Sequence, residues 1–188
     1  MTGSTRPLQG AEDFQKLYQE TYLNVFRFIY ALHGGTRQDI EDLTSETYYH
    51  AWKARSRFQG NQDAAMRWLL RISRNLVYDS FRRQKIRRNT FSLEEIDEMI
   101  LIPGSSPAAP DQILAYREDF VKLWSLIQEL NPNHREILLL RYMMGWRVNE
   151  IAAHIDNSEN NVSATLRRIL QRLQRAWTEE IPELIDEN

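Results

Sequence analysis

The spacing of hydrophobic residues predicts helices along almost the whole chain. Apolar side chains recur every three or four positions over residues 14–32, 40–58 and 66–81, which is the spacing of one helix face. Glycines at Gly34 and Gly60 follow the first two runs, and Thr36 with Asp39 forms a capping-box pattern for the second helix. No stretch alternates as a strand does. Three helices with short connections therefore predict a compact bundle over residues 11–88, after a disordered segment at residues 1–10.

The pattern changes after this bundle. Residues 89–111 hold five acidic residues and no basic ones, and three prolines fall within residues 103–110. Proline interrupts helices and central strands, so this segment is predicted to be an extended acidic linker. Its apolar residues, among them Ile96 and Met99, indicate that part of it lies against a surface.

A second small helical domain is predicted over residues 112–178, followed by an acidic tail at residues 179–188. A stripe formed by Ile113, Phe120, Trp124 and Ile127 leads to Asn131-Pro132, a helix cap followed by proline at the first helical position. The next helix is filled by the apolar residues Ile137, Leu138, Leu140 and Tyr142, and Gly145 terminates it. The chain is therefore expected to be all-α, with two helical domains joined by the linker.

The end of the second domain has the pattern of a helix-turn-helix. Residues 148–155 predict a helix of about two turns, and Asp156-Asn157 follows it. Asp and Asn tolerate the left-handed backbone that a tight turn between helices requires. Ser158 is a good N-cap for a long final helix, whose inward stripe includes Val162 and Leu166.

The outward face of this final helix is expected to read duplex DNA. Near its start the sequence places Ser158, Asn160, Asn161, Ser163, Ala164, Thr165, Arg167 and Arg168. Asn and Arg can pair bidentately with adenine and guanine, and Ser and Thr can reach phosphates or bases. The alternative is an ordinary solvated polar face. Glu159 has two interpretations: it stabilises the helix N-terminus, or it accepts a hydrogen bond from cytosine.

Charge is segregated along the chain, although the net charge is only -2. Residues 1–88 contain fifteen Lys and Arg against nine Asp and Glu, whereas residues 113–188 contain nine against twelve. Such asymmetry suggests separate partners for separate segments, including nucleic acid. No apolar run is long enough to cross a bilayer and no signal peptide is recognisable, so a cytoplasmic protein is expected.

The sequence offers little for catalysis. It has no cysteine, which excludes disulfides, thiol catalysis and cysteine-ligated metal sites. Its histidines lie on different predicted helices without metal-ligand spacing: His33, His50, His134 and His154. No glycine-rich phosphate loop, nucleophile elbow or HExxH motif occurs. We therefore expect no enzyme activity, no catalytic residue, no cofactor, no metal site and no small-molecule substrate.

Three stretches taken in order resemble a known family. They are DIEDLTSETYYHAW at residues 39–52, residues 68–79 with Arg82-Arg83, and residues 130–141 followed by the helix-turn-helix. Over roughly residues 14–177 the chain resembles the extracytoplasmic-function sigma factors of bacterial RNA polymerase. The resemblance implies a transcription initiation factor that binds core polymerase, melts and reads the promoter −10 element, and reads the −35 duplex.

The resemblance also assigns residues. Contacts with the β′ clamp helices of core polymerase are expected from Asp39, Asp42, Ser45, Glu46, Tyr49 and Trp52, and region 4 is expected to bind the β flap. Contacts with the −10 element are expected from Trp68, Arg71, Arg74, Asn75, Tyr78, Arg82 and Arg83, with Phe81 nearby and Lys85, Arg87 and Arg88 along the phosphates. Asn75 matches a position that in the family lies in the loop around a base flipped from the stack.

Alternatives remain for some of these residues. For Trp68 the sequence favours a place in the bundle core over a stacking platform, and Asn75 has the alternative of a helix-capping amide. The family often has Gln where this chain has Ser45. It commonly has a basic residue where this chain has Thr165 and a Gly-Thr-like pair where Asn160-Asn161 stand, which leaves the −35 sequence open.

The family further implies an anti-sigma partner. It also implies a linker that runs through a channel for RNA, with Glu94, Glu95, Asp97 and Glu98 as mimics of phosphate; a plain tether is the alternative. The rival to the whole interpretation is a stand-alone helix-turn-helix regulator, which would bind a palindrome as a dimer without core polymerase.

Overall fold

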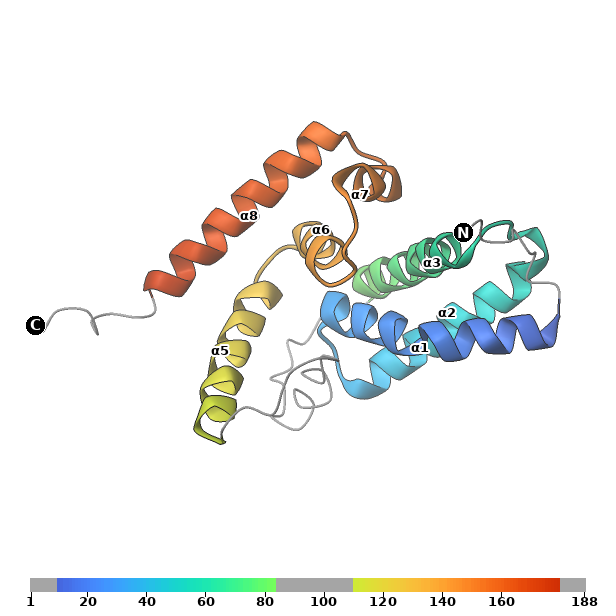
Figure 1. The fold of residues 1–188 in the computed structure, drawn as a ribbon, viewed down its shortest axis with the longest axis horizontal. Coiled ribbons are helices and arrows are strands. Elements are labelled where there is room, and N and C mark those ends of the chain that lie inside the picture. Colours follow the sequence, from blue (N-terminus) through green and yellow to red (C-terminus); the bar gives the residue numbers. More distant parts are fainter. Residues whose placement is uncertain (1–9, 84–109, 180–188) are drawn as a thin grey trace, which may run out of the picture. The chain divides into compact units, whose positions relative to one another are not determined.

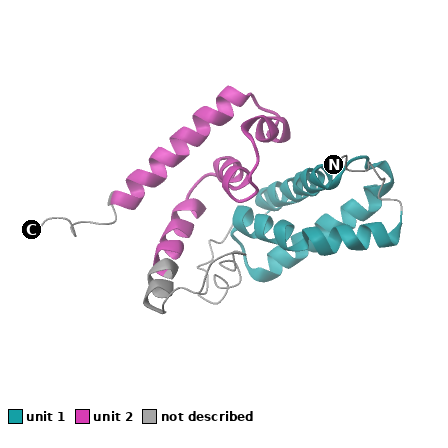
Figure 2. Ribbon diagram, in the orientation of Figure 1, with its two compact units in different colours: residues 1–89 teal, residues 90–188 magenta. Residues whose placement is uncertain are grey.

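The computed structural model describes residues 10–83 and 110–179, and in the second range it describes side chains for residues 118–178 (Figure 1). Every regular element in these ranges is a helix, which confirms the all-α class. The N-terminal segment, the basic residues after Arg83, nearly all of the linker and the acidic tail lie outside the described residues. The chain divides into two compact units, residues 1–89 and 90–188, and each is described by itself (Figure 2).

Unit 1 is a bundle of three long helices. They are α1 (Ala11–His33), α2 (Arg37–Ala54) and α3 (Gln62–Arg83), with the 3-10 turn η1 (Arg55–Arg57) between the last two. Each long helix packs against the other two. The largest side chains that this packing removes from water are Phe28, Ile29, Leu32, Ile40, Leu69 and Leu70. Burial of such side chains stabilises the bundle by about 1.5–3 kcal/mol each.

The second helix ends earlier than its apolar pattern predicted. Instead of running to Phe58, α2 stops at Ala54 and the chain tightens into η1. Phe58 is still buried, because its ring stacks on Trp68 at 4.9 Å between centroids. Phe58 therefore belongs to the core without being part of α2.

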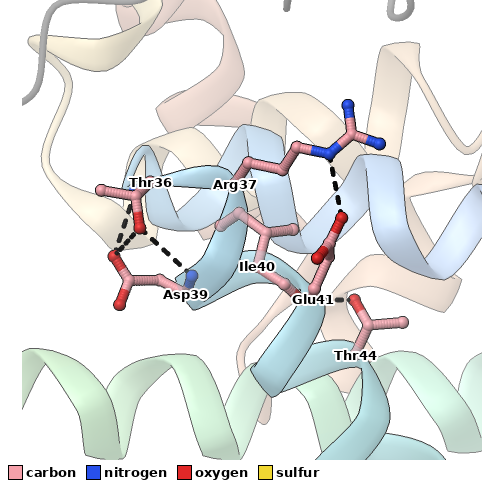
Figure 3. Close-up of polar contacts among 6 residues, drawn as sticks. All are labelled: Thr36, Arg37, Asp39, Ile40, Glu41 and Thr44. Atoms are coloured by element: carbon pink, nitrogen blue, oxygen red, sulfur yellow. Dashed lines mark hydrogen bonds and ion pairs between the residues drawn. The ribbon is translucent and has the colours of Figure 1, made fainter.

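The start of α2 is fixed by the expected capping box (Figure 3). The Asp39 backbone N–H donates to Thr36 Oγ1 at 3.2 Å, and Asp39 Oδ2 accepts from the Thr36 backbone N–H at 3.1 Å. The Thr36 hydroxyl also donates to Asp39 Oδ2 at 2.6 Å. Just before it, Gly34 closes α1 with φ 68°, a left-handed conformation that glycine adopts without steric cost.

Polar side chains inside unit 1 bond to one another. Tyr48 and Thr21 share a hydrogen bond of 2.8 Å between α2 and α1, and burial raises the pKa of the Tyr48 phenol. The Thr47 hydroxyl lies 3.4 Å from Ser73 Oγ on α3. These bonds fix the relative registers of the three helices, since buried polar groups need specific partners.

Unit 2 contains α5 (Pro110–Gln128), α6 (Pro132–Tyr142), α7 (Val148–Ile155) and α8 (Glu159–Glu179). Its apolar centre includes Leu130, Leu138 and Ile169. Asn131 caps α6 as expected, accepting from the His134 N–H at 2.9 Å. Tyr142, the last residue of α6, is 60% exposed.

The turn between α7 and α8 has the predicted geometry. Asp156 takes φ 56°, the only positive φ at a non-glycine position among the described residues. Ser158 then begins α8, its Oγ accepting from the Asn161 N–H at 3.2 Å and its carbonyl from the Val162 N–H at 3.0 Å. This left-handed residue and cap set the direction in which α8 leaves α7.

A buried contact between two ionisable side chains and a cation–π contact join the helices of unit 2. Glu136 Oε1 of α6 and His154 Nε2 of α7 lie 3.6 Å apart with side chains 1% and 3% exposed, and Trp146 packs edge-on to the His154 ring. Lys122 of α5 lies over the Trp177 ring near the end of α8, at 4.9 Å, and donates to the Trp177 carbonyl at 3.3 Å. None of the helices in the described ranges is long and apolar enough to cross a membrane.

Replacing Thr36 by valine is expected to lower the free energy of unfolding of unit 1 by about 1 kcal/mol, because the N-cap hydroxyl is lost. Urea unfolding of the full chain measures it. Thr44→Val is the matched control: the Thr44 hydroxyl only donates to the Ile40 carbonyl within α2, so its loss should matter much less. Equal effects of the two substitutions would contradict the assigned role of the cap.

A pH dependence follows from His134, which faces α8. Partial burial, with Arg168 and Arg172 nearby, lowers the pKa of His134 below its ordinary 6.5. The unfolded chain therefore takes up this proton first as the pH falls. The contribution of neutral His134 to the free energy of unfolding is therefore present above the unfolded pKa of 6.5. It is lost as the pH falls from 6.5 toward the lower pKa of the folded state. We expect His134→Gln to reduce the slope of unfolding free energy between pH 5.5 and 7, measured by urea titrations; unchanged slopes would refute this.

Candidate polymerase and DNA interfaces

The exposed face of α2 is acidic and aromatic. Asp42, Ser45, Glu46 and Tyr49 are all exposed, and successive helix positions turn by about 100°, so these residues share one side of the helix. Tyr49 is 54% exposed, with the Lys53 ammonium 4.2 Å from its ring centroid. The predicted docking face therefore presents carboxylates beside an accessible aromatic ring.

Two residues expected on that face are engaged within the bundle. Asp39 closes the capping box with its carboxylate, as described above. Trp52 is only partly exposed: it packs edge-on to Phe14 at 5.1 Å, and the Arg55 guanidinium lies 3.6 Å from its ring centroid. The capping role of Asp39 was expected from its spacing from Thr36, whereas the packing of Trp52 inside the bundle was not.

The exposed face of α3 is basic. Arg71, Asn75 and Arg82 are exposed and Tyr78 partly so; helical rotation puts them on one side, opposite the buried Leu69 and Val77. Arg74 flanks this side, its guanidinium 4.9 Å from the Tyr78 ring centroid. Arg67 shares the same side, one turn before Arg71, and the prediction had omitted it. The basic and aromatic side chains expected at the −10 element are thus brought together.

Asn75 lies in a helix, as the apolar spacing over residues 66–81 predicted, and not in a loop, as the resemblance implied. Asn75 lies in the middle of α3, because the apolar stripe of that helix continues without a break on both sides of it. It is exposed, and it caps no helix end among the described residues. Trp68 is only partly buried and stacks on Phe58, which favours the bundle-core interpretation over that of an open stacking platform.

The end of α3 is tied to the junction of α1 and α2. His33 is 4% exposed, its ring stacks on Phe81 at 5.3 Å with an interplanar angle of 7°, and its Nε2 lies 2.8 Å from Ser80 Oγ. Phe81 is therefore packed against the bundle. Arg82, one residue on, pairs with Asp79 at 2.9 Å and is exposed. The exposed Arg82 thus lies at the end of a helix that is anchored to the rest of unit 1.

The outward face of α8 carries most of the predicted DNA-reading residues. Ser158, Asn160, Asn161, Ser163, Ala164, Arg167 and Arg168 are all exposed. Gln171 continues the same face one turn after Arg167, and the prediction missed it although its spacing could have indicated it. Val162, Leu166 and Ile169 are buried on the opposite side, which fixes the rotation of the helix.

Thr165 corrects the prediction for this face. It is 6% exposed, because it lies three residues after Val162 and so falls at the border of the buried stripe. Its Oγ1 accepts from Arg168 Nη2 at 3.2 Å, and Arg168 Nε lies 3.4 Å from the Ala164 carbonyl. Thr165 therefore holds Arg168 along the helix and does not face outward itself.

No cluster of three or more His, Cys, Asp or Glu side chains able to hold a metal ion occurs in the described part of the chain. The three faces consist of carboxylates, arginines, amides and aromatic rings. Such groups suit binding to basic helices, phosphates and bases.

Two family models match the chain. The model of sigma-70 region 2 matches residues 17–87, which include the α2 and α3 faces, and a model of sigma-70 region 4 matches residues 120–173, which include the helix-turn-helix. The two matches occur in the order that the resemblance predicted.

Curated relatives of the chain are described as ECF RNA polymerase sigma factors. The chain is 30% identical over 167 residues to the ECF RNA polymerase sigma factor BldN of Streptomyces coelicolor, covering 88% of this chain and 60% of BldN. It is 26% identical over 177 residues to the ECF RNA polymerase sigma factor SigX of Bacillus subtilis, covering 94% of this chain and 89% of SigX. The match thus spans somewhat under two thirds of BldN but most of SigX.

Solved structures share the fold. The sigma factor RpoE from Bartonella quintana, crystallised with the anti-sigma factor NepR, matches with a TM-score of 0.65 at 22% identity, covering 89% of this chain and 98% of RpoE. CnrH in complex with the cytosolic domain of CnrY matches with a TM-score of 0.65 at 19% identity, covering 92% of both chains. With both region models matched in order, the chain belongs to the sigma-70 family of RNA polymerase sigma factors, in its extracytoplasmic-function group.

Proposed function

We propose that this chain binds core RNA polymerase and directs it to promoters by reading the −35 duplex with α8 and opening the −10 element with α3. The observation that carries the proposal is the exposed side of α3 formed by Arg71, Asn75, Tyr78 and Arg82, in a chain that also has a helix-turn-helix. A protein that binds only duplex DNA through its helix-turn-helix would not need a second basic face that combines arginines with an aromatic ring.

Docking on the polymerase is assigned to α2. Asp42, Glu46 and Tyr49 present two carboxylates and a half-exposed ring without a break in the helix. A basic helical partner, for which the β′ clamp helices are our candidate, would pair with the carboxylates and pack on the ring. Complementary charges of this kind mainly speed encounter and fix register. We assign the β flap contact to unit 2.

Strand opening is assigned to α3. A base that leaves the stack costs a few kcal/mol, and stacking on an aromatic side chain returns about 1–3 kcal/mol per base. Tyr78 is the partly exposed ring on this face, and Asn75 lies less than one turn before it with an amide that can read a base edge. The arginines at positions 71, 74 and 82 would hold the phosphates of the captured strand.

Recognition of the −35 duplex is assigned to α8. Its first turns present Asn160, Asn161 and Arg167 on the side away from the core, which is how a recognition helix meets the major groove. Arg168 is directed along the helix by Thr165, and the stripe of exposed arginines continues with Arg172.

The remaining partners follow from the family. RpoE and CnrH, which share this fold, were solved with NepR and with the cytosolic domain of CnrY, respectively. We propose that an anti-sigma factor likewise controls this chain and that it acts in the cytoplasm. The polymerase would supply all catalysis, and the chain none.

Run-off transcription with purified core polymerase tests the proposal. Adding the chain should produce promoter-specific transcripts and a one-to-one complex with core, whereas the chain alone should bind promoter DNA weakly. A stand-alone regulator would give the opposite result: tight binding to a palindrome as a dimer, and no stimulation of core.

Arg167→Ala should weaken −35-dependent initiation by about 1–3 kcal/mol, because a bidentate base contact is lost. Initiation by the holoenzyme is compared on promoters with intact and scrambled −35 elements. Arg57→Ala, which removes an exposed arginine in η1 outside the three faces, is the control and should leave the −35 preference intact. An unchanged preference in the Arg167 variant would disprove its role.

Asn75→Ala should impair open-complex formation without altering −35 preference. Permanganate reactivity of unpaired thymines in the −10 region reports opening directly. A template already mismatched over that region should rescue the variant at least in part, since the cost of unstacking has been removed. Normal opening of a fully paired promoter by the variant would count against the assigned role.

A further inference from the structure

The start of α8 contains a hydrogen-bond network that involves two asparagines. Asn157 Oδ1 accepts from the Ser158 backbone N–H at 2.8 Å and from Asn161 Nδ2 at 2.9 Å. The Asn161 backbone N–H in turn donates to Ser158 Oγ at 3.2 Å. All three side chains are exposed, so the network lies on the surface that the helix-turn-helix presents.

The network determines which way the Asn161 amide points. A backbone N–H can only donate, so the Asn157 atom beside Ser158 N must be the carbonyl oxygen and not the amide nitrogen. The Asn161 atom facing that same oxygen must then be a donor, which is Nδ2. The orientation therefore follows from the chemistry of the Ser158 N–H, a donor that cannot be exchanged for an acceptor.

An amide held in this way can still offer a donor and an acceptor to a base. Nδ2 carries two hydrogens, and the bond to Asn157 uses one of them. Bidentate recognition requires that Asn157 takes the hydrogen trans to Oδ1, which leaves the hydrogen cis to Oδ1 to form a donor and acceptor pair with it. Adenine presents the complementary pair in the major groove, N7 as acceptor and the N6 amino group as donor, whereas guanine presents two acceptors.

We propose that Asn157 is a positioning residue for promoter recognition: it fixes the Asn161 amide in the one orientation that reads an adenine in the −35 element. The proposal rests on the function proposed for α8 and adds the base that this position selects. Without Asn157 the amide rotates by half a turn at little cost, and the flipped amide can donate and accept in the reversed order. A variant without Asn157 then loses discrimination between bases, but its Asn161 side chain still contacts the DNA.

Competition among promoters tests this. Reconstituted holoenzyme is offered a library with every base at each −35 position, and initiated transcripts are sequenced. We expect an A·T preference of about tenfold or more at one position, which Asn161→Ala abolishes. Asn157→Ala should reduce the preference at that same position to about threefold or less, while preferences at the other positions persist.

Asn157→Asp is the matched rescue variant. Its carboxylate still accepts from the Ser158 N–H and from Asn161 Nδ2, so the adenine preference should survive. Its added charge will lower affinity for all sequences alike, and the ratio between bases cancels that loss. Thermal unfolding of both variants checks that unit 2 remains folded.

Each other outcome overturns the proposal. Full discrimination in Asn157→Ala, equal loss at every −35 position, or loss in Asn157→Asp as large as in Asn157→Ala would each exclude a positioning role. So would an Asn161→Ala variant that reads every −35 position normally. Failure of the proposed function looks different: the unsubstituted holoenzyme would then show no −35 preference at all.

Discussion

The one constraint on which the three proposed binding surfaces depend is that an amphipathic helix has a single outward side. Burial of one stripe fixes the rotation of a helix, and the opposite residues become its surface without further choice. In α3 the buried Leu69 and Val77 turn Arg71 outward, and in α8 the buried Val162 and Ile169 do the same for Arg167. The helical spacing that buries one stripe of residues in the core therefore also determines which residues can contact a partner.

The sequence predicted the elements well because their signals are local. The capping box at Thr36, the left-handed turn at Asp156 and the cap at Ser158 each depend on a few neighbouring residues, and the structure has all three. The end of α2 was misplaced because Phe58 was counted in its apolar stripe, whereas Phe58 is buried after the helix by stacking on Trp68, ten residues later. Local patterns do not contain that contact.

The site was predicted less completely, for two different reasons. Thr165 was placed outward on its chemistry, although its spacing from Val162 puts it at the edge of the core. Asn75 was placed in a loop from the resemblance, although the unbroken apolar stripe of α3 indicated a helix. The bond between Asn157 and Asn161 could not be foreseen at all, since it depends on side-chain rotamers.

The long final helix has a mechanical consequence. As a continuous helix of 21 residues, α8 spans about 30 Å, and only its first turns are proposed to meet the groove. Its far end is held by Lys122, which contacts the Trp177 ring and carbonyl. Its first turns are held as well, because Val162, Leu166 and Ile169 are buried against the other helices of unit 2. The packing of the domain therefore sets the position of the reading end. Promoter alignment could then evolve through residues that never touch a base.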